Sequence, residues 1–512
     1  MVNGTRASAQ AVIERTKSRP PRARTSIAAV IAVTSWMSVV AGCAPETRIV
    51  VAAPATPTSA TAPGAALPLA QGAASSEPAD KARAAVSSDA IQVFAAAESS
   101  VLRTGTSQAF IGVGVDVPRG HVAFRPKVAV GLLVDTSGSM AGAKIESARR
   151  AATTFVQNLV DGDVVGVDVF DDTARTLVVP TVLDAETRPR ILAAIAALGT
   201  GGSTNMFDGL TLSESHLAGS PATHAVRRVV ILSDGRANVG RSSAAELGNI
   251  AERGLASRVQ VTSLGVGLDY DESTLNALSV RSSGRLYHIG DPREMTATLQ
   301  REVALIGDTV ASDASLEVVP APGVRVIGAE GVHSTWNGRA FRIPLGALFA
   351  GQHREALVRV ALDGAEAQTE RPLASVRLLY RDPRDGDLER VKETVARVSF
   401  SSDDAAVARG ADERVKAMVS LVDAGRVQIA AAQRINEGDF AAADRELSVA
   451  QRSLEERAHA TRDVAEKKRL DSQAQALGAT RSSVAKAAAA PKPVQRSEAL
   501  KLNKEGMSTM GF

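Results

Sequence analysis

The sequence contains a single cysteine, Cys43, among 512 residues. A disulfide framework and a cysteine-ligated zinc site are therefore excluded. Aromatic residues make up only 3% of the chain, while 22% of the residues are charged and the mean hydropathy is zero. These values are typical of a soluble globular protein, and the length allows several domains with at least one sizeable core.

A large net charge is also missing, and what charge there is lies at one end. The whole chain carries +3, but residues 1–42 hold six basic residues against one acid. The remainder is therefore slightly negative, at about −2, and composition gives no reason to expect a nucleic-acid partner.

The N-terminal segment is typical of a secretory signal. In residues 1–42 a basic stretch precedes an apolar run of about 15 residues, which is too short to span a bilayer comfortably. The sequence Val40-Ala41-Gly42 before Cys43 resembles a bacterial lipobox, which implies a diacylated thiol. The alternative is a short membrane anchor with an incidental cysteine. Residues 43–88, rich in Ala, Pro, Thr and Ser, are predicted to be a disordered tether.

Residues 128–308 alternate strands and helices. Apolar runs such as "VAVGLLV", "DVVGVDVF", "RRVVIL" and "VQVTSLGVG" are separated by amphipathic segments. Fully apolar strands are expected where a sheet is covered on both faces. The repeated units predict an α/β fold with a doubly wound, mostly parallel sheet, in which ligands bind at the carboxyl ends of the strands.

The flanking segments have other patterns. Residues 89–127 form a β-rich lead-in that could pair with later strands, and residues 309–402 read as a β-sandwich-like domain. Residues 403–484 are predicted to be a helical hairpin region. Residues 485–512, rich in Ala, Lys, Ser and Pro, are predicted to be a disordered tail.

Five oxygen-bearing side chains lie in three segments of the α/β domain. These segments are the end of the strand "VAVGLLV" with the loop after it, the glycine-rich "GTGGST", and the end of the strand "RRVVIL". The five side chains are Asp135, Ser137, Ser139, Thr204 and Asp234. The carboxyl ends of parallel strands share one edge of a sheet, so these residues are expected to meet there. Two carboxylates and three hydroxyls suit a hard divalent cation, Mg²⁺ or else Mn²⁺ or Ca²⁺. Helix capping is the alternative for Asp135 and Ser139, but it leaves the other residues unexplained.

With these residues, the segment 128–308 resembles a von Willebrand factor type A domain. The five residues match the metal-ion-dependent adhesion site of that family. The resemblance implies that the two serines bind the metal directly, and that the threonine and the acids bind directly or through water. More widely, the chain resembles bacterial envelope proteins similar to inter-alpha-trypsin inhibitor heavy chains. We expect Asp135 to lie at an exposed edge, so that its replacement would spare the fold.

Other polar residues near these motifs have simpler interpretations. Asn205 and Asp208 are expected to cap a helix. Asp171 and Asp172 are expected to lie in a solvated turn, and His288 is expected to be a packed or edge residue.

Enzymatic activity is not expected. The glycine-rich "GTGGST" lacks the lysine of a phosphate-binding loop, and neither a G-x-S-x-G elbow nor an H-E-x-x-H motif occurs. The predicted function is adhesion or scaffolding, in which the cation grips an exposed Asp or Glu of a protein partner. The alternative is a structural or assembly factor in which the β and helical domains bind the partner and the metal only stabilises loops.

The expected location is the cell envelope, with the lipid on Cys43 as the membrane anchor. Ala44 stands where an Asp would mark retention in the inner membrane. We therefore expect the outer membrane, with the outer face of the cytoplasmic membrane as the alternative.

Overall fold

The computed structural model describes residues 86–120, 122, 124–234, 236–268, 270–363 and 370–510. All of them belong to one of two compact units, Asp80–Phe512. The predicted signal segment, the lipidation at Cys43 and nearly all of the predicted tether lie outside the described residues.

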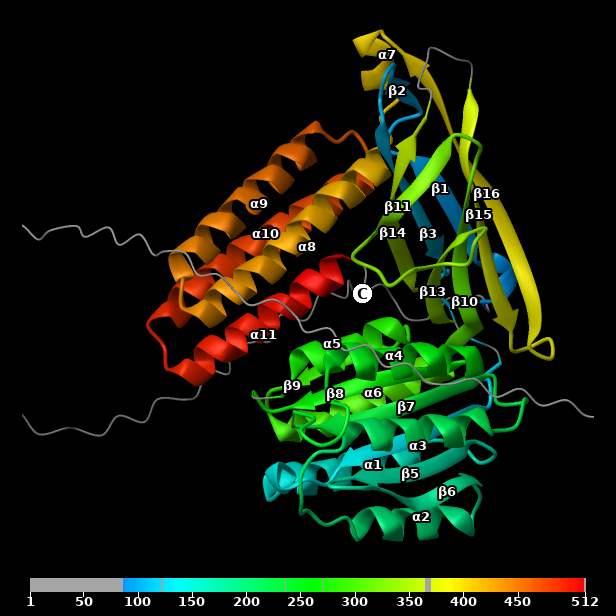
Figure 1. The fold of residues 1–512 in the computed structure, drawn as a ribbon, viewed down its shortest axis with the longest axis vertical. Coiled ribbons are helices and arrows are strands. Elements are labelled where there is room, and N and C mark those ends of the chain that lie inside the picture. Colours follow the sequence, from blue (N-terminus) through cyan, green and yellow to red (C-terminus); the bar gives the residue numbers. More distant parts are fainter. Residues whose placement is uncertain are drawn as a thin grey trace, which may run out of the picture. The chain divides into compact units, whose positions relative to one another are not determined.

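A six-stranded sheet forms the centre of the α/β domain (Figure 1). In spatial order its strands are β6 (Ala174–Val182), β5 (Val164–Phe170), β4 (Val128–Asp135), β7 (Val226–Ser233), β8 (Val259–Val266) and β9 (Arg285–Ile289). Only β6 is antiparallel to its neighbour. The chain passes from β4 to β5 on one side and later returns to β7 on the other, so β4 lies at the topological switch point where such folds bind ligands.

Helices cover both faces of this sheet. One hydrophobic cluster joins it to α1 (Ala143–Asn158), α2 (Thr187–Ala196) and α6 (Met295–Gly307). A second cluster joins the other face to α3 (Met206–Ala218), α4 (Ala244–Gly254) and α5 (Glu272–Arg281). Every residue of β4, β5, β7 and β8 is buried, as expected for strands covered on both faces. The predicted doubly wound, mostly parallel sheet is confirmed.

Two sheets, antiparallel except for the β2–β16 pair, form a β-sandwich around one hydrophobic cluster. The four-stranded sheet has the order β1 (Gln92–Ala97), β3 (Gln108–Asp116), β14 (His353–Leu362) and β11 (Val324–Glu330). The six-stranded sheet has the order β12 (Thr335–Trp336), β13 (Phe341–Phe349), β10 (Thr309–Pro320), β15 (Arg371–Asp382), β16 (Leu388–Ser401) and β2 (Val101–Arg103). β3 pairs with β14, and β2 pairs in parallel with β16. The α/β domain is therefore inserted between β3 and β10 of the sandwich.

The C-terminal region is helical and longer than a hairpin. After the short α7 (Asp404–Arg409) it consists of α8 (Glu413–Glu437), α9 (Phe440–Ala460), α10 (Val464–Ala488) and α11 (Lys492–Thr509). Helices α8 to α11 share a hydrophobic cluster rich in alanine and leucine. None of the helices among the described residues combines the length and the hydropathy that crossing a bilayer requires.

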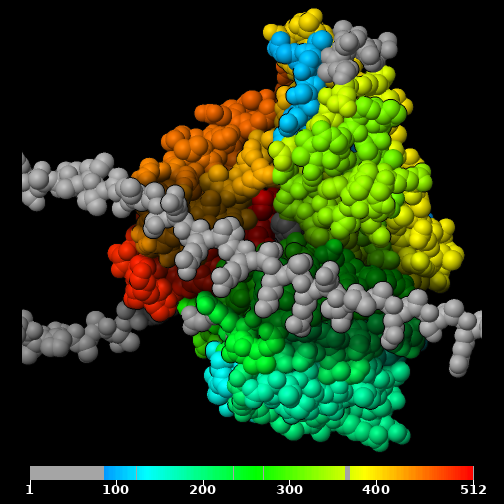
Figure 2. Space-filling view, in the orientation of Figure 1, coloured from blue at the N-terminus to red at the C-terminus, as the bar shows by residue number. Residues whose placement is uncertain are grey.

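The structure corrects the expectation of a disordered tail. Residues 492–509 form α11, in which Leu500 is 1% exposed and belongs to the same hydrophobic cluster as α5 of the α/β domain. The Asn503 side-chain amide donates to the carboxylate of Glu272 at the start of α5. Figure 2 shows the red surface of this segment between the orange surface of the other C-terminal helices and the green surface of the α/β domain. The polar composition did not indicate this helix, because packing against the rest of the fold stabilises it.

Candidate metal centre

Asp135 ends β4 and is fully buried. Its Oδ1 accepts a hydrogen bond from the backbone N–H of Ser137 at 2.8 Å, and its Oδ2 accepts one from the hydroxyl of Ser233 at 2.5 Å. Burial raises the pKa of Asp135, and the negative charge of Asp234 adds to the effect, while the two serines oppose it. The expectation of an exposed edge position was wrong, because Ser233 and the loop after β4 close over the carboxylate.

The two serines connect the carboxylates. The hydroxyl oxygens of Ser137 and Ser139 lie 3.0 Å apart, and the Ser139 hydroxyl donates to Oδ1 of Asp234 at 2.7 Å. Met140 of the same loop is fully buried in the core and anchors the short 3₁₀ turn Gly138–Met140. The loop therefore presents both hydroxyls from a fixed backbone.

Thr204 lies on the glycine-rich loop before α3. Its N–H donates to the Asn238 side-chain oxygen at 2.8 Å, and its carbonyl accepts from the Asn238 N–H at 3.1 Å. Two backbone hydrogen bonds also join this loop to the one after β4, from Gly138 N–H to the Gly202 carbonyl and from Gly201 N–H to the Thr136 carbonyl. Between described residues, no hydrogen bond joins the Thr204 hydroxyl to the other four side chains, so Thr204 adjoins the cluster rather than completing it.

Two aspartates of the β5–β6 turn hold the glycine-rich loop in place. Asp172 accepts a hydrogen bond from the Ser203 N–H at 2.9 Å, and the Asp171 carbonyl accepts from the Asn205 N–H at 2.7 Å. Gly202 has φ +76°, and a Cβ there would lie 2.5 Å from the Asp172 carboxylate. Both acids were expected in a solvated turn, and this role could not be predicted because the tertiary fold brings the turn to the loop.

The helix cap before α3 is made by Asn205 and not by Asp208. The Asn205 side chain caps α3 by accepting from the Asp208 N–H, and its amide donates to the Asp208 carboxylate at 2.8 Å. Capping by Asn205 is therefore confirmed. His288 lies in β9 beside the ring of Tyr270, with 5.6 Å between ring centroids.

Lys144, which sequence analysis also missed, contributes the positive charge nearest to the cluster. Its ammonium group donates to the Oδ2 of Asp234 and, at 3.3 Å, to the carbonyl of Ser139. The Asp234 side chain is fully buried, whereas the Lys144 side chain is 34% exposed. The lysine can therefore leave while the carboxylate stays in place.

The oxygen atoms of this cluster fit a divalent cation. In an octahedral Mg²⁺ site with ligands at about 2.0–2.1 Å, neighbouring oxygens are about 2.9 Å apart. The pairs Ser137–Ser139 and Ser139–Asp234 have separations of 3.0 and 2.7 Å. Among the described residues no group of three or more His, Cys, Asp or Glu side chains could hold a metal. The donor set consists of oxygens alone, which favours a hard cation over zinc.

Comparisons with known proteins concern the α/β domain that carries this cluster. The family model of the von Willebrand factor type A domain matches residues 130–302. An uncharacterized protein of Synechocystis is 25% identical over 266 residues, which are 50% of this chain and 62% of that protein. The human inter-alpha-trypsin inhibitor heavy chain H4 is 25% identical over 218 residues, 39% of this chain and 23% of its own.

A solved structure extends the likeness beyond the matched domain. A von Willebrand factor type A protein from Catenulispora acidiphila aligns with a TM-score of 0.66 and 17% identity, over 81% of this chain and 96% of that one. At this identity the likeness shows the fold. Since the chain spans less than two thirds of the length of both sequence relatives, their activities and partners are not transferred to it.

Proposed function

Residues 130–302 form a von Willebrand factor type A domain, and from this premise we propose that the protein binds a partner protein through a divalent cation. The cation would be Mg²⁺, or Mn²⁺ or Ca²⁺, held at the edge where β4 and β7 end. The residues that would hold it are Asp135, Ser137, Ser139, Thr204 and Asp234. The observation that carries the proposal is the chain of hydrogen bonds that runs from Asp135 through the Ser137 N–H and the hydroxyls of Ser137 and Ser139 to Asp234.

The charges of the cluster support binding of an acidic residue of the partner protein. Two carboxylates and neutral hydroxyls balance a divalent cation only when both acids are ionised and Lys144 no longer pairs with Asp234. Hydroxyls hold a hard cation without adding charge, so a carboxylate from outside remains a favourable further ligand. When bound, the cation would act as a Lewis acid to which a carboxylate oxygen of an Asp or Glu of the partner binds.

Asp234 and Asp135 have different roles in the proposed site. Asp234 contacts both Ser139 and Lys144, so it faces the position that the cation would take. Asp135 accepts from the Ser137 N–H and thereby orients the loop that carries both serines. A site in which one acid contacts the cation and the other positions the loop would be rigid enough to select a small, hard ion.

Anchoring to the cell envelope is part of the proposal. The support is the basic and apolar segment before Cys43 and the absence of any other cysteine in the chain. The lipid would hold the binding domains at the outer membrane, or at the outer face of the cytoplasmic membrane.

The experiment is partner capture from envelope extract with the purified full chain, in Mg²⁺ and again in EDTA. The test variant is Ser139→Ala, because Ser139 is exposed and its loss leaves the buried acids in place. Ser215→Ala on α3 is the matched control, since this exposed serine donates only to the Leu212 carbonyl of its own helix. The same capture is carried out with all three proteins.

Capture in Mg²⁺ that is lost in EDTA and in Ser139→Ala, but kept in Ser215→Ala, is the expected result. Equal capture in EDTA would overturn the proposal. It would move partner binding to the β-sandwich or the C-terminal helices, with the metal as a loop stabiliser.

A further inference from the structure

Helix α8 packs on one face of the four-stranded sheet of the sandwich (Figure 1). Leu357 of β14 and Val415 of α8 belong to a small hydrophobic cluster at this contact, whereas the neighbouring Val358 belongs to the core of the sandwich. Successive residues of a strand point to opposite faces of a sheet. His353 and Glu355, which alternate with Leu357 at the start of β14, therefore lie on the face that α8 covers.

Glu355 binds two of the C-terminal helices. Its Oε1 accepts a hydrogen bond from Arg414, the second residue of α8, at 2.9 Å, and its Oε2 accepts one from Arg469 of α10 at 2.5 Å. Burial raises the pKa of Glu355, but His353 and Arg469 outweigh burial and bring the pKa to about 2. The carboxylate is therefore ionised throughout the pH range in which a histidine titrates.

Asp116 supplies a second carboxylate from the neighbouring strand. It ends β3 and lies opposite His353 in the pairing of β3 with β14. Its Oδ2 accepts a hydrogen bond from Arg414 at 3.2 Å. The guanidinium carbon of Arg414 also lies 3.4 Å from the ring centroid of Phe94 in β1. Arg414 of α8 thus contacts three strands of the four-stranded sheet.

Both ring nitrogens of His353 face a carboxylate. Nδ1 contacts Asp116, and Nε2 lies 2.9 Å from Oε1 of Glu355. An ionised carboxylate only accepts hydrogen bonds, and a neutral imidazole carries one N–H whereas an imidazolium carries two. Only the protonated ring can therefore donate to both acids at once. Hydrogen bonding to Glu355 raises the pKa of His353, Asp116 adds to the effect, and burial opposes it.

The other charged groups on the surrounding elements leave this arrangement in place. Glu466 of α10 pairs with Arg469 at 3.6 Å. Lys504 of α11 lines the same pocket of about 420 Å³ as His353, and Arg119 in the loop after β3 is exposed. Between described residues, none of these three groups forms an ion pair or hydrogen bond with His353.

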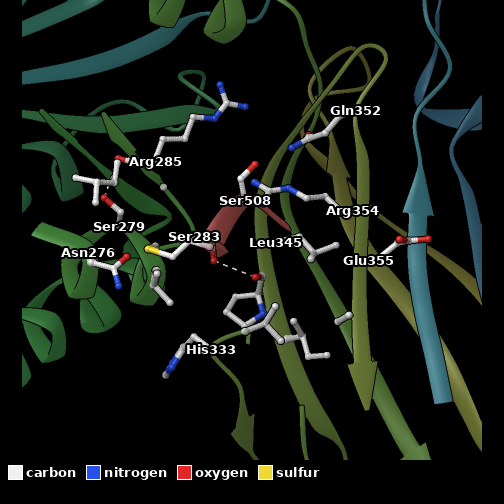
Figure 3. A pocket seen from close by; sticks show the side chains of 18 of the residues that line it. Asn276, Ser279, Ser283, Arg285, His333, Leu345, Gln352, Arg354, Glu355 and Ser508 are labelled. Atoms are coloured by element: carbon white, nitrogen blue, oxygen red, sulfur yellow. Dashed lines mark hydrogen bonds between the residues drawn. The ribbon is translucent and has the colours of Figure 1, made fainter. Parts of the chain in front are cut away.

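Arg354 and the total charge complete the description of these surroundings. Figure 3 shows Arg354 and Glu355 on opposite sides of β14. When Glu466 is ionised, the face that α8 covers holds three carboxylates and two guanidinium groups, those of Arg414 and Arg469. The imidazolium of His353 then balances the charge.

We propose that protonation of His353 strengthens the docking of the C-terminal helices on the sandwich, so that they are held more tightly in mildly acidic than in alkaline surroundings. The protonated ring donates to Asp116 and Glu355, and these acids accept from Arg414 of α8 and Arg469 of α10. Loss of the proton leaves one ring nitrogen facing a carboxylate with no hydrogen between them, which weakens this arrangement. The inference does not depend on the candidate metal centre.

The direction of the pH dependence follows from the difference between the folded and unfolded chain. Folding raises the pKa of His353, so the stabilisation is complete below the unfolded value of 6.5 and is lost as the pH rises through the folded value. The His353 side chain is 41% exposed, and solvent weakens such ion pairs. The expected change in the opening equilibrium of the docked helices is therefore about two- to fivefold.

The experiment follows hydrogen exchange in the first turns of α8 and α10 in the full chain near pH 5.5 and near pH 9, corrected for the chemical exchange rate. The variant is His353→Gln, because the glutamine amide keeps a hydrogen-bond donor but carries no charge. His459→Gln is the matched control, since His459 is exposed on α9 and forms no ion pair or hydrogen bond with another described residue. A second measurement is the NMR titration of ¹³C-labelled histidines, in which the His353 signal is the one that the variant lacks.

Near pH 5.5 the two helices of His353→Gln should open about two- to fivefold more often than those of the wild type. Near pH 9 the two proteins should agree, and His459→Gln should match the wild type at both values. The titration should give His353 a pKa above 6.5. Equal opening of wild type and His353→Gln near pH 5.5, an undiminished difference near pH 9, or a His353 pKa at or below 6.5 would overturn the proposal.

Discussion

At the residue scale, the chain places its ionisable groups in contrasting surroundings. Asp135 and Asp234 are both buried, yet each is satisfied by serine hydroxyls and by a backbone N–H or an ammonium group. Glu214 of α3 is buried as well, but its Oε1 has no hydrogen-bond partner among the described residues. A buried carboxylate without donors is destabilised in its charged form. The buried acids of the candidate metal centre thus have hydrogen-bond donors, whereas Oε1 of Glu214 has none among the described residues.

Replacement of Glu214 by glutamine is predicted to stabilise the protein at high pH. Burial raises the pKa of Glu214 from 4.5 to about 8, although the charge of Arg253 opposes the shift. Between these values the folded chain holds a proton that the unfolded chain has lost, so the free energy of unfolding falls as the pH rises. Thermal unfolding should give Glu214→Gln a higher melting temperature than wild type near pH 9 and no such advantage near pH 4.

The exposed Glu146 of α1, changed to glutamine in the same way, is the control. A Glu214→Gln difference that does not vary between pH 4 and pH 9 would mean that folding does not raise the pKa of Glu214.

At the element scale, the sequence predicted those strands and helices that depend on the local pattern of apolar and polar residues. The strand "VAVGLLVD" was recognisable because all eight of its residues are buried. The placement of Asp135 and Asp234 together followed from the rule that parallel strands end at one edge. By contrast, β6 exposes Val179 and alternates as an edge strand, and α11 has few apolar residues. Lys144 was missed because its contact depends on a side-chain conformation rather than on spacing.

Helix α11 is predicted to depend on its contact with the α/β domain. Leu500→Ala should lower the free energy of unfolding by about 2–5 kcal/mol, because Leu500 is buried in one cluster with Leu275 and Leu278. Val494→Ala, on the exposed face of the same helix, should change it by less than about 0.5 kcal/mol. Denaturant unfolding measures both values, and hydrogen exchange should show α11 losing protection only in Leu500→Ala. Equal effects of the two changes would contradict the packing described for α11.

At the scale of the whole described unit, the domains meet away from the candidate metal centre. Gln260 and Ser283, at the amino ends of β8 and β9, contact β13 of the sandwich. Asp135 and Asp234 lie instead at the carboxyl ends of β4 and β7. A partner could therefore reach the metal centre without displacing the sandwich. The expectation that residues 89–127 could pair with later strands agrees with the pairing of β3 with β14 and of β2 with β16. The sequence did not indicate which strands would pair, because the partners are more than 200 residues apart.

The most direct test of this account is calorimetric titration of the full chain with Mg²⁺ and with Mn²⁺. The wild type is expected to bind one divalent ion per chain. In Asp234→Asn, which removes the acid that contacts Ser139 and Lys144, the affinity should fall at least about tenfold. Asp208→Asn, at an exposed acid of the neighbouring helix start, should bind like the wild type. Undiminished affinity in Asp234→Asn, or no binding by the wild type, would contradict the account.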